Sequence, residues 1–204
     1  MKKSILCFGD SNTWGYHPKD GSRYPFELRW TGRLQTSLGS NYHIIEEGLN
    51  GRTTCINEQE RLMRSAKDIL SVLLESHRPL SFVILMIGTN DLKTHVQRTA
   101  QNIAADLSDL CALIEDHPLL VDQRPKLILA APTGPDETCH QLPEWFQNTH
   151  AKWRSLLELL PEVAQNHGAE YLATETIMDM KFHDGLHWSE QQHEDFASGV
   201  QKYL

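Results

Sequence analysis

Five short apolar runs, separated by longer amphipathic stretches, constrain the fold of this chain more than any other feature. The runs are Ser4–Phe8, Tyr42–Glu46, Ser81–Ile87, Lys126–Ala131 and Glu170–Ala173. The third and fourth are almost continuously apolar, which is typical of strands covered on both faces of a parallel sheet. The chain therefore predicts a mostly parallel sheet of five strands.

The stretches between these runs carry apolar residues at helical spacing. One stripe begins at Leu62 and extends to Leu74, a second spans Ile103–Ile114, and a third spans Trp153–Val163. Within the third stripe, Pro161 is expected to kink or restart the helix, because proline lacks the N–H that the helix needs. Strands alternating with helices predict an α/β fold with right-handed crossovers.

Helix boundaries are also visible in the sequence. Ser189 followed three residues later by Gln192 is a capping-box pattern, so a last helix should begin there. Gly39 and Gly168 stand where helices should end. No linker or internal repeat interrupts the pattern, so we expect residues 1–204 to form one domain, a flavodoxin-like three-layer α/β/α sandwich.

Composition excludes several classes of function. The 204 residues carry 27 acidic against 19 basic side chains, a net charge of −8, and no basic patch, which argues against a nucleic-acid partner. The longest strongly apolar run, Phe82–Ile87, is too short to span a membrane. The apolar run near the start ends at Gly9, too soon for a secretion signal. We therefore expect a cytoplasmic protein with reduced thiols. The four cysteines show no metal-binding spacing; they are Cys7, Cys55, Cys111 and Cys139.

Polar segments follow three of the predicted strands and precede the last helix. They are Gly9–Asn12, Gly48–Thr54, Gly88–Asp91 and Asp184–His187. In open α/β sheets the loops after the carboxyl ends of the strands converge on the ligand-binding crevice. These four segments are therefore expected to meet.

Together the segments contain the groups that ester hydrolysis requires. Ser11 can act as nucleophile once His187 accepts its proton, and Asp184 can orient the imidazole. The N–H groups of Ser11 and Gly51 and the side-chain amide of Asn90 can receive the oxyanion. The pattern therefore favours a serine hydrolase.

Each element also has an ordinary structural interpretation. Ser11 alone is more often a turn or helix-capping residue, and Asp184-Gly185 alone is a turn signal. His183 and His187 can be read as a metal pair, although no further ligand has supporting spacing. A non-catalytic binding module of flavodoxin type is a more distant alternative, because the first strand is not followed by G-x-G-x-x-G.

The four segments resemble those of the SGNH (GDSL-type) hydrolase superfamily. Gly9–Asn12 matches the nucleophile block, with Asn12 where leucine is commonest, and the glycine of the second block falls on Gly51. Gly88–Asp91 and Asp184–His187 match the third and fourth blocks. The blocks cover nearly the whole chain in the expected order.

This resemblance implies an acyl-enzyme mechanism without a metal or organic cofactor, carried out by Ser11, His187 and Asp184. The residues around Ser11 and Gly51 look like the intracellular arylesterase and acyltransferase branch, which implies short acyl esters, acetyl to butyryl, and a possible homo-oligomer. A thioesterase or lysophospholipase with the same triad is the alternative. The implied partner is a small-molecule ester, with neither a nucleic acid nor a membrane.

Substrate contacts are expected from four further residues. Asn12, Trp14 and Arg52 lie beside the catalytic blocks, and Arg52 can attract an anionic substrate. Trp145 follows a long insertion after the fourth strand and can form a wall of the acyl pocket or a subunit contact.

Overall fold

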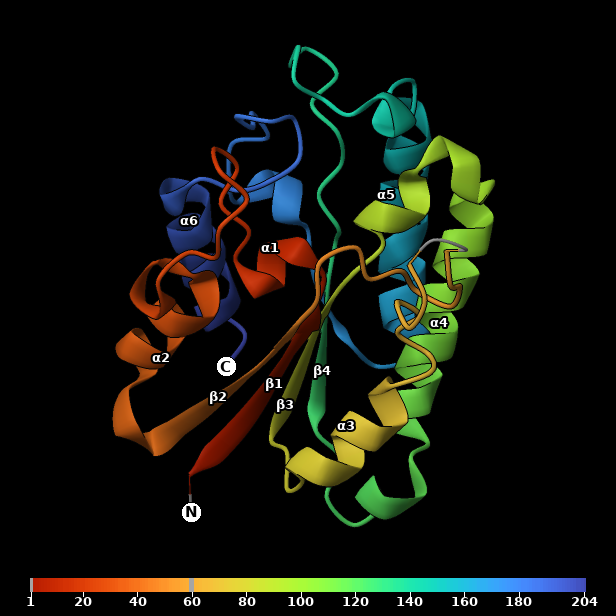
Figure 1. Ribbon diagram of the computed structural model, residues 1–204. Coiled ribbons are helices and arrows are strands. Elements are labelled where there is room, and N and C mark those ends of the chain that lie inside the picture. The colour runs from red at the N-terminus through yellow and green to blue at the C-terminus, as the bar shows by residue number, and fades with distance from the viewer. Residues whose placement is uncertain (1, 59–60) are drawn as a thin grey trace.

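The computed structural model describes residues 2–58 and 61–204 and contains a central sheet of five parallel strands, in the order β2-β1-β3-β4-β5 (Figure 1). The predicted strands are all confirmed, with ends that differ by at most two residues from those expected. Their bounds are β1 (Lys3–Gly9), β2 (Tyr42–Gly48), β3 (Phe82–Met86), β4 (Lys126–Ala130) and β5 (Glu170–Leu172).

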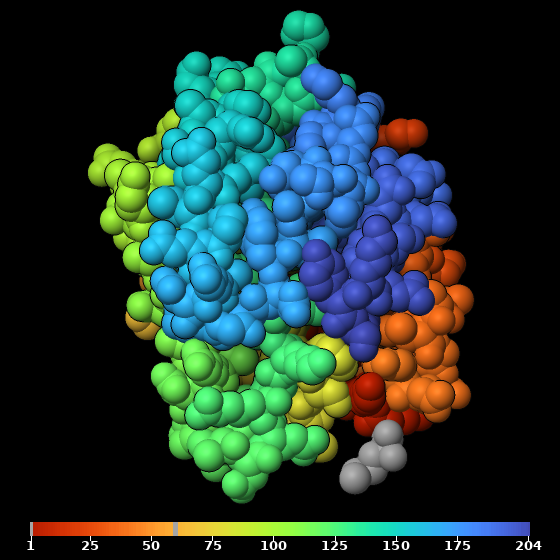
Figure 2. Space-filling view, turned by 180° about the vertical axis from the view of Figure 1, so that it is seen from behind, coloured from red at the N-terminus to blue at the C-terminus, as the bar shows by residue number. Residues whose placement is uncertain are grey.

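Helices cover both faces of this sheet, as the predicted α/β/α sandwich requires. On one face lie α2 (Trp30–Leu38) and α6 (Glu190–Gln201), which pack side by side and are seen together from behind in Figure 2. On the other face lie α3 (Leu70–His77), α4 (Ala100–Glu115) and α5 (His150–Asn166). The short α1 (Ser11–Trp14) follows β1 directly and packs against the end of β2.

The buried strands supply two separate hydrophobic cores. In β1, Leu6 and Phe8 join the core beneath α3, α4 and α5, whereas Ile5 and Cys7 join the core beneath α2 and α6. Successive side chains of a strand point to opposite faces, so a strand covered on both sides must be apolar at every position. This explains why the central runs of the sequence do not alternate.

The helix expected from Leu62 begins only at Leu70, so that part of the prediction is wrong. The preceding residues pair with another loop instead: Thr53 donates its N–H to the Arg64 carbonyl at 3.0 Å and accepts the Ala66 N–H at 2.9 Å. Leu62 itself is 69% exposed. Although Leu62 has helical spacing to the later leucines, it therefore does not belong to the helix or to the core.

The remaining helix predictions differ in outcome. Pro161 lies inside α5, which continues without interruption to Asn166, so the expected restart is absent. The capping box of Ser189 and Gln192 is present at the start of α6. Gly39 and Gly168 have positive φ angles of 67° and 59° just after α2 and α5, as expected of residues that end helices.

The helices and the cysteines bear on the membrane and thiol predictions made from the sequence. Among the described residues, no helix is both long and apolar enough to cross a lipid bilayer. All four cysteines lie in the described part of the chain and carry free thiols, and Cys7 and Cys111 are buried.

Candidate active site

Ser11 lies at the carboxyl end of β1, in the turn that leads into α1. The Asp10 carboxylate caps this short helix by accepting the Asn12 N–H at 3.1 Å. Burial raises the pKa of Asp10 to about 6. Asp10 therefore organises the turn, and Ser11 lies in this turn on the wall of a cavity.

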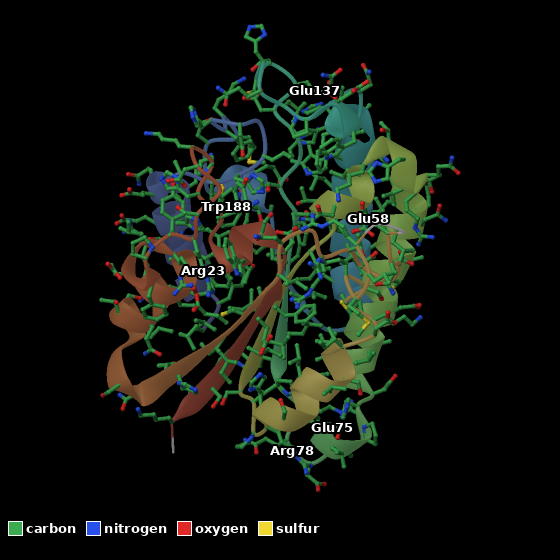
Figure 3. The ribbon with its side chains drawn as sticks, viewed as in Figure 1. Arg23, Glu58, Glu75, Arg78, Glu137 and Trp188 are labelled. Atoms are coloured by element: carbon green, nitrogen blue, oxygen red, sulfur yellow. The ribbon has the colours of Figure 1, made fainter. Side chains whose placement is uncertain are left out.

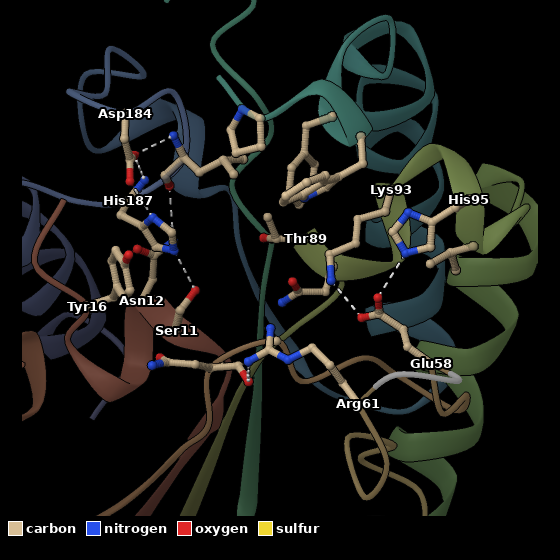
Figure 4. A pocket seen from close by; sticks show the side chains of 18 of the residues that line it. Ser11, Asn12, Tyr16, Glu58, Arg61, Thr89, Lys93, His95, Asp184 and His187 are labelled. Carbon is tan, nitrogen blue, oxygen red and sulfur yellow. Dashed lines mark hydrogen bonds and ion pairs between the residues drawn. The ribbon is translucent and has the colours of Figure 1, made fainter. Parts of the chain in front are cut away.

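His187 links Ser11 to Asp184 in a continuous hydrogen-bonded chain. Its Nε2 lies 3.0 Å from Ser11 Oγ, and its Nδ1 lies 2.7 Å from Asp184 Oδ2 (Figure 4). The other Asp184 oxygen accepts the backbone N–H groups of Leu186 and His187 at 3.0 and 2.8 Å. Burial alone would raise the pKa of Asp184, but the His187 ring and these N–H groups hold it below its usual value. The carboxylate is therefore ionised at neutral pH.

Tyr16 supports the imidazole from the side, and sequence reasoning did not identify it. Its ring centroid lies 4.1 Å from that of His187, with the planes tilted by 31°. Its only sequence signal is its position five residues after Ser11. Packing of the two rings restricts the orientation of the imidazole.

Gly51 and Asn90 lie on the same cavity wall as Ser11. Gly51 has φ of +77°, a conformation that favours glycine. Asn90, in the short 3-10 helix η3 (Thr89–Leu92), donates one amide hydrogen to the Arg52 carbonyl at 3.1 Å. The second amide hydrogen remains for a ligand. The structure thus brings together all the sequence-predicted oxyanion residues.

Asn12, expected to contact substrate, instead fixes the loop that carries His187. Its side-chain nitrogen donates to Thr133 Oγ1 at 3.2 Å and to the Leu186 carbonyl at 3.4 Å, and its oxygen accepts the Trp188 N–H at 3.2 Å. Leu186 and Trp188 flank His187 on both sides. Although Asn12 borders the cavity, its polar atoms are occupied within the fold.

Arg52 and Trp14 do not line the cavity, contrary to expectation. The Arg52 guanidinium donates to the carbonyls of Gly9, at 2.9 Å, and Glu47, and it lies 4.3 Å from the Phe8 ring centroid. Burial lowers its pKa to about 10, so it stays charged at neutral pH. Arg52 therefore ties the ends of β1 and β2 together. Trp14 lies outside the cavity, and the Arg23 guanidinium lies over its ring, 5.2 Å from the ring centroid of Trp14.

The cavity itself measures about 1060 Å³ and has two contrasting boundaries. Trp145 borders it, as expected, and its side chain is half-exposed; Pro143 and Phe146 lie on the same boundary. Glu58 and further charged side chains form another part of the wall. Figure 3 shows Trp188 to the left and Glu58 to the right of the place where the strands end.

A metal centre has no counterpart among the described residues. No group of three or more His, Cys, Asp or Glu side chains converges there, and His183 is not joined with His187 into such a group.

Known proteins share the sequence pattern and the fold of this chain. Residues 7–194 match the model of the GDSL-like lipase/acylhydrolase family. The fold is similar to that of Est24, a carbohydrate acetylesterase from Sinorhizobium meliloti, with 33% identity, a TM-score of 0.88 and complete coverage of both chains. It is also similar to the M. smegmatis aryl esterase, with 30% identity, a TM-score of 0.88 and coverage of 99% of this chain and 100% of that one. A putative arylesterase from Agrobacterium tumefaciens shares 29% identity, with a TM-score of 0.83 and the same coverage. No curated protein sequence matches the chain. The chain belongs to the GDSL-like lipase/acylhydrolase family and is a serine ester hydrolase.

Proposed function

We propose that this protein hydrolyses carboxylic esters of short acyl groups, acetyl to butyryl, with Ser11, His187 and Asp184 as its catalytic triad. The observation that carries the proposal is the chain of contacts from Ser11 Oγ to His187 Nε2, at 3.0 Å, and from His187 Nδ1 to Asp184 Oδ2, at 2.7 Å. This is the arrangement that activates a serine hydroxyl.

The first half of the reaction forms an acyl-enzyme. Ser11 Oγ attacks the ester carbonyl carbon while His187 Nε2 takes the hydroxyl proton, and Asp184 stabilises the resulting imidazolium. The developing oxyanion accepts hydrogen bonds from the N–H groups of Ser11 and Gly51 and from the Asn90 amide. The tetrahedral intermediate then expels the alcohol, which takes the proton from His187.

The second half releases the acyl group. Water gives its proton to His187 and attacks the acyl carbon, and collapse of the second intermediate returns the proton to Ser11. An alcohol that replaces water accepts the acyl group instead, so the same site supports acyl transfer to alcohols. No step requires a group beyond the side chains and amides described above.

The choice of short acyl groups rests on the two named similarities. One similar protein is described as a carbohydrate acetylesterase and another as an aryl esterase. The half-exposed Trp145 ring on the cavity wall suits either kind of alcohol, because aromatic rings pack against both aryl groups and the apolar faces of sugars.

The test is the Ser11→Ala variant, assayed with p-nitrophenyl esters from acetate to octanoate. We expect the variant to lose roughly 10⁴-fold or more in kcat, since only the oxyanion site and binding remain. The unmodified protein should prefer the acetate to butyrate esters and react with a fluorophosphonate probe at Ser11.

Ser22→Ala is the matched control, because Ser22 is exposed and its hydroxyl contacts only Asp20 among the described residues. This variant should keep full turnover and probe labelling. Normal turnover by Ser11→Ala would refute the proposed mechanism. A preference for acyl-CoA or lysophospholipid over the short esters would instead refute the proposed substrate class.

A further inference from the structure

Opposite the catalytic triad, the cavity is bounded by a cluster of charged side chains that the proposed mechanism does not use. Lys93 Nζ lies 2.6 Å from Glu58 Oε1, and His95 Nε2 lies 2.9 Å from Glu58 Oε2. Figure 4 shows this cluster across the cavity from Ser11 and His187. We call Glu58, Lys93 and His95, together with Arg61, the charged wall.

Lys93 is the buried cation of the charged wall. Its side chain is only 6% exposed, yet it borders the cavity. An ammonium group has three hydrogens, and Glu58 accepts one of them. Because little water reaches this group, an additional acceptor from a ligand would form a strong, charge-assisted hydrogen bond.

Glu58 does not present a free negative charge to the cavity. Burial alone would raise the pKa of its carboxyl, but the hydrogen bonds from Lys93 and His95 hold the pKa below its usual value. Each carboxylate oxygen therefore carries charge and already accepts one hydrogen bond. Glu58 holds the two donors in place and is itself occupied.

Arg61 brings a second cation to the same wall, close to the oxyanion site. A Cβ added to Gly51 would lie 2.4 Å from Arg61 Nη1, so the guanidinium rests directly against that glycine. Its Nη2 makes a long contact of 3.4 Å with the Asn50 carbonyl. Figure 4 shows the guanidinium extending from the side of Glu58 toward Ser11.

The charge of this wall is opposite to that of the whole chain. The protein carries a net charge of −8, whereas in the charged wall the two cations Lys93 and Arg61 outnumber the one carboxylate, that of Glu58. The other carboxylate that borders the cavity belongs to Asp184, at the opposite end, where it is paired with His187. A surface with an excess of one sign of charge attracts ligands of the other sign. Arginine and lysine donors are matched by carboxylate oxygens.

We propose that the natural ester carries a carboxylate on its alcohol part, and that Lys93 and Arg61 bind this carboxylate. The assignment to the alcohol part rests on the proposed function, because an acetyl to butyryl group is too short to extend across a cavity of about 1060 Å³. The substrate class is thus the short-acyl esters of hydroxy acids, including phenolic acids and sugar acids.

The experiment compares two acetate esters, 4-acetoxybenzoate and its methyl ester, which differ in this charge and by one methyl group. The ratio of their kcat/KM values is measured for the unmodified protein and for the variants Lys93→Met and Arg61→Gln. Both esters lose the same acetyl group, and comparing ratios between variants cancels their different intrinsic reactivities. Lys67→Met is the matched control, because Lys67 is an exposed lysine paired with Asp109 and lies outside the cavity.

The kcat/KM for 4-acetoxybenzoate divided by that for its methyl ester should fall about tenfold in each cavity variant, mainly because KM for the acid rises. A tenfold change corresponds to the loss of about one hydrogen bond to a charged group. The control should keep the ratio of the unmodified protein. Turnover of the methyl ester shows in the same assay that each variant is folded, and exposed Arg61 can be replaced with little effect on packing.

An unaltered ratio in both cavity variants would overturn the proposal. The proposal would also be overturned if a carboxylate raised kcat/KM only when it stood on the acyl group. The ester 4-nitrophenyl hemisuccinate, which carries its carboxylate there, tests this. Failure of the proposed function looks different, because neither acetate ester would then be hydrolysed.

Discussion

The two ends of the cavity are built in different ways. The end that carries the proposed triad, called the catalytic end below, is formed by tight turns at the ends of regular elements, Asp10–Asn12 after β1 and Asp184–His187 before α6. The charged wall draws Glu58 and Arg61 from the irregular segment between β2 and α3. Turns at the ends of regular elements hold the proposed reacting groups, whereas an irregular segment, which tolerates change more readily, forms the surface that we propose faces the rest of the substrate.

The irregular segment is nevertheless well held by specific contacts. The Asn57 side-chain oxygen accepts the backbone N–H groups of Arg64 and Ser65 at 2.8 and 3.2 Å. The Arg64 side chain donates to the Asn50 carbonyl at 3.0 Å. Side-chain to backbone hydrogen bonds thus replace the ladder of a sheet, so this wall can be altered without disturbing the strands.

The Asp184→Asn variant tests whether the two ends act independently, and it should have the largest effect. The amide can no longer stabilise an imidazolium and favours the wrong tautomer of His187, so kcat should fall roughly 10⁴-fold for every ester. The ratio between 4-acetoxybenzoate and its methyl ester should stay as in the unmodified protein. Steady-state kinetics with both esters measures the two quantities together.

Two results would contradict the independence of the two ends of the cavity. A kcat within about tenfold of the unmodified protein would show that Asp184 does not serve the triad. A change in the ratio of the two esters would show that the catalytic end also selects the substrate. Asp109→Asn is a suitable control, because Asp109 is exposed and pairs only with Lys67 among the described residues.

A second, smaller effect is expected from Asn12→Leu, which tests whether the catalytic end depends on one buried amide. Leucine has the same branching and the same number of side-chain heavy atoms but removes the three hydrogen bonds to Thr133, Leu186 and Trp188. We expect kcat to fall about 10- to 100-fold with little change in KM, because a displacement of about 1 Å at His187 is sufficient for this.

The same substitution leaves the buried Trp188 N–H without its acceptor, which should lower the free energy of unfolding by about 1–3 kcal/mol. Urea unfolding measures this loss separately from the kinetics. Asn12→Asp should be intermediate in kcat, since it can still accept the Trp188 N–H. Asn166→Leu, at an exposed position, is the control. Loss of stability with an unaltered kcat would show that Asn12 has no part in positioning His187.

The catalytic end could largely be predicted from the sequence, because each of its segments combines a local turn signal with the end of a predicted element. Ser11 and the pair Asp184 and His187 are recognisable for this reason. The direction of a side chain is harder to predict. Arg52 follows Gly51 directly, yet its guanidinium turns inward to the carbonyls of Gly9 and Glu47.

The charged wall could not be predicted in this way. Glu58 and Lys93 are 35 residues apart and meet only because loops from β2 and β3 converge. The late start of α3 has a similar cause, since Arg64 and Ala66 pair with Thr53 across the same segment. Such contacts between irregular segments leave no periodic trace in the sequence.

Between Asn90, at one end of the cavity, and Lys93, in the charged wall, the chain passes through a buried cluster around Asp91. Asp91 accepts the Thr54 N–H, and Thr54 Oγ1 lies 2.6 Å from Asp91 and 2.9 Å from Asp106. One hydroxyl hydrogen cannot serve two ionised carboxylates. Because Asp106 is paired with Arg98, the additional proton belongs on Asp91. Burial, with a contribution from Asp106, indeed raises the pKa of Asp91 to about 7.

This protonation has a consequence for stability that Asp91→Asn should reveal. Between about pH 4 and 7 the unfolded chain loses this proton while the folded chain keeps it, so the free energy of unfolding falls as pH rises, by up to about 1.4 kcal/mol per unit. Asparagine reproduces the hydrogen bonds of the protonated acid and removes this dependence. Urea unfolding at pH 5 and pH 8 measures the free energy of unfolding of both proteins. The value for the variant minus that for the unmodified protein should rise by about 1–3 kcal/mol from pH 5 to pH 8. A constant difference between the two proteins at these pH values would mean that Asp91 is ionised in the folded state.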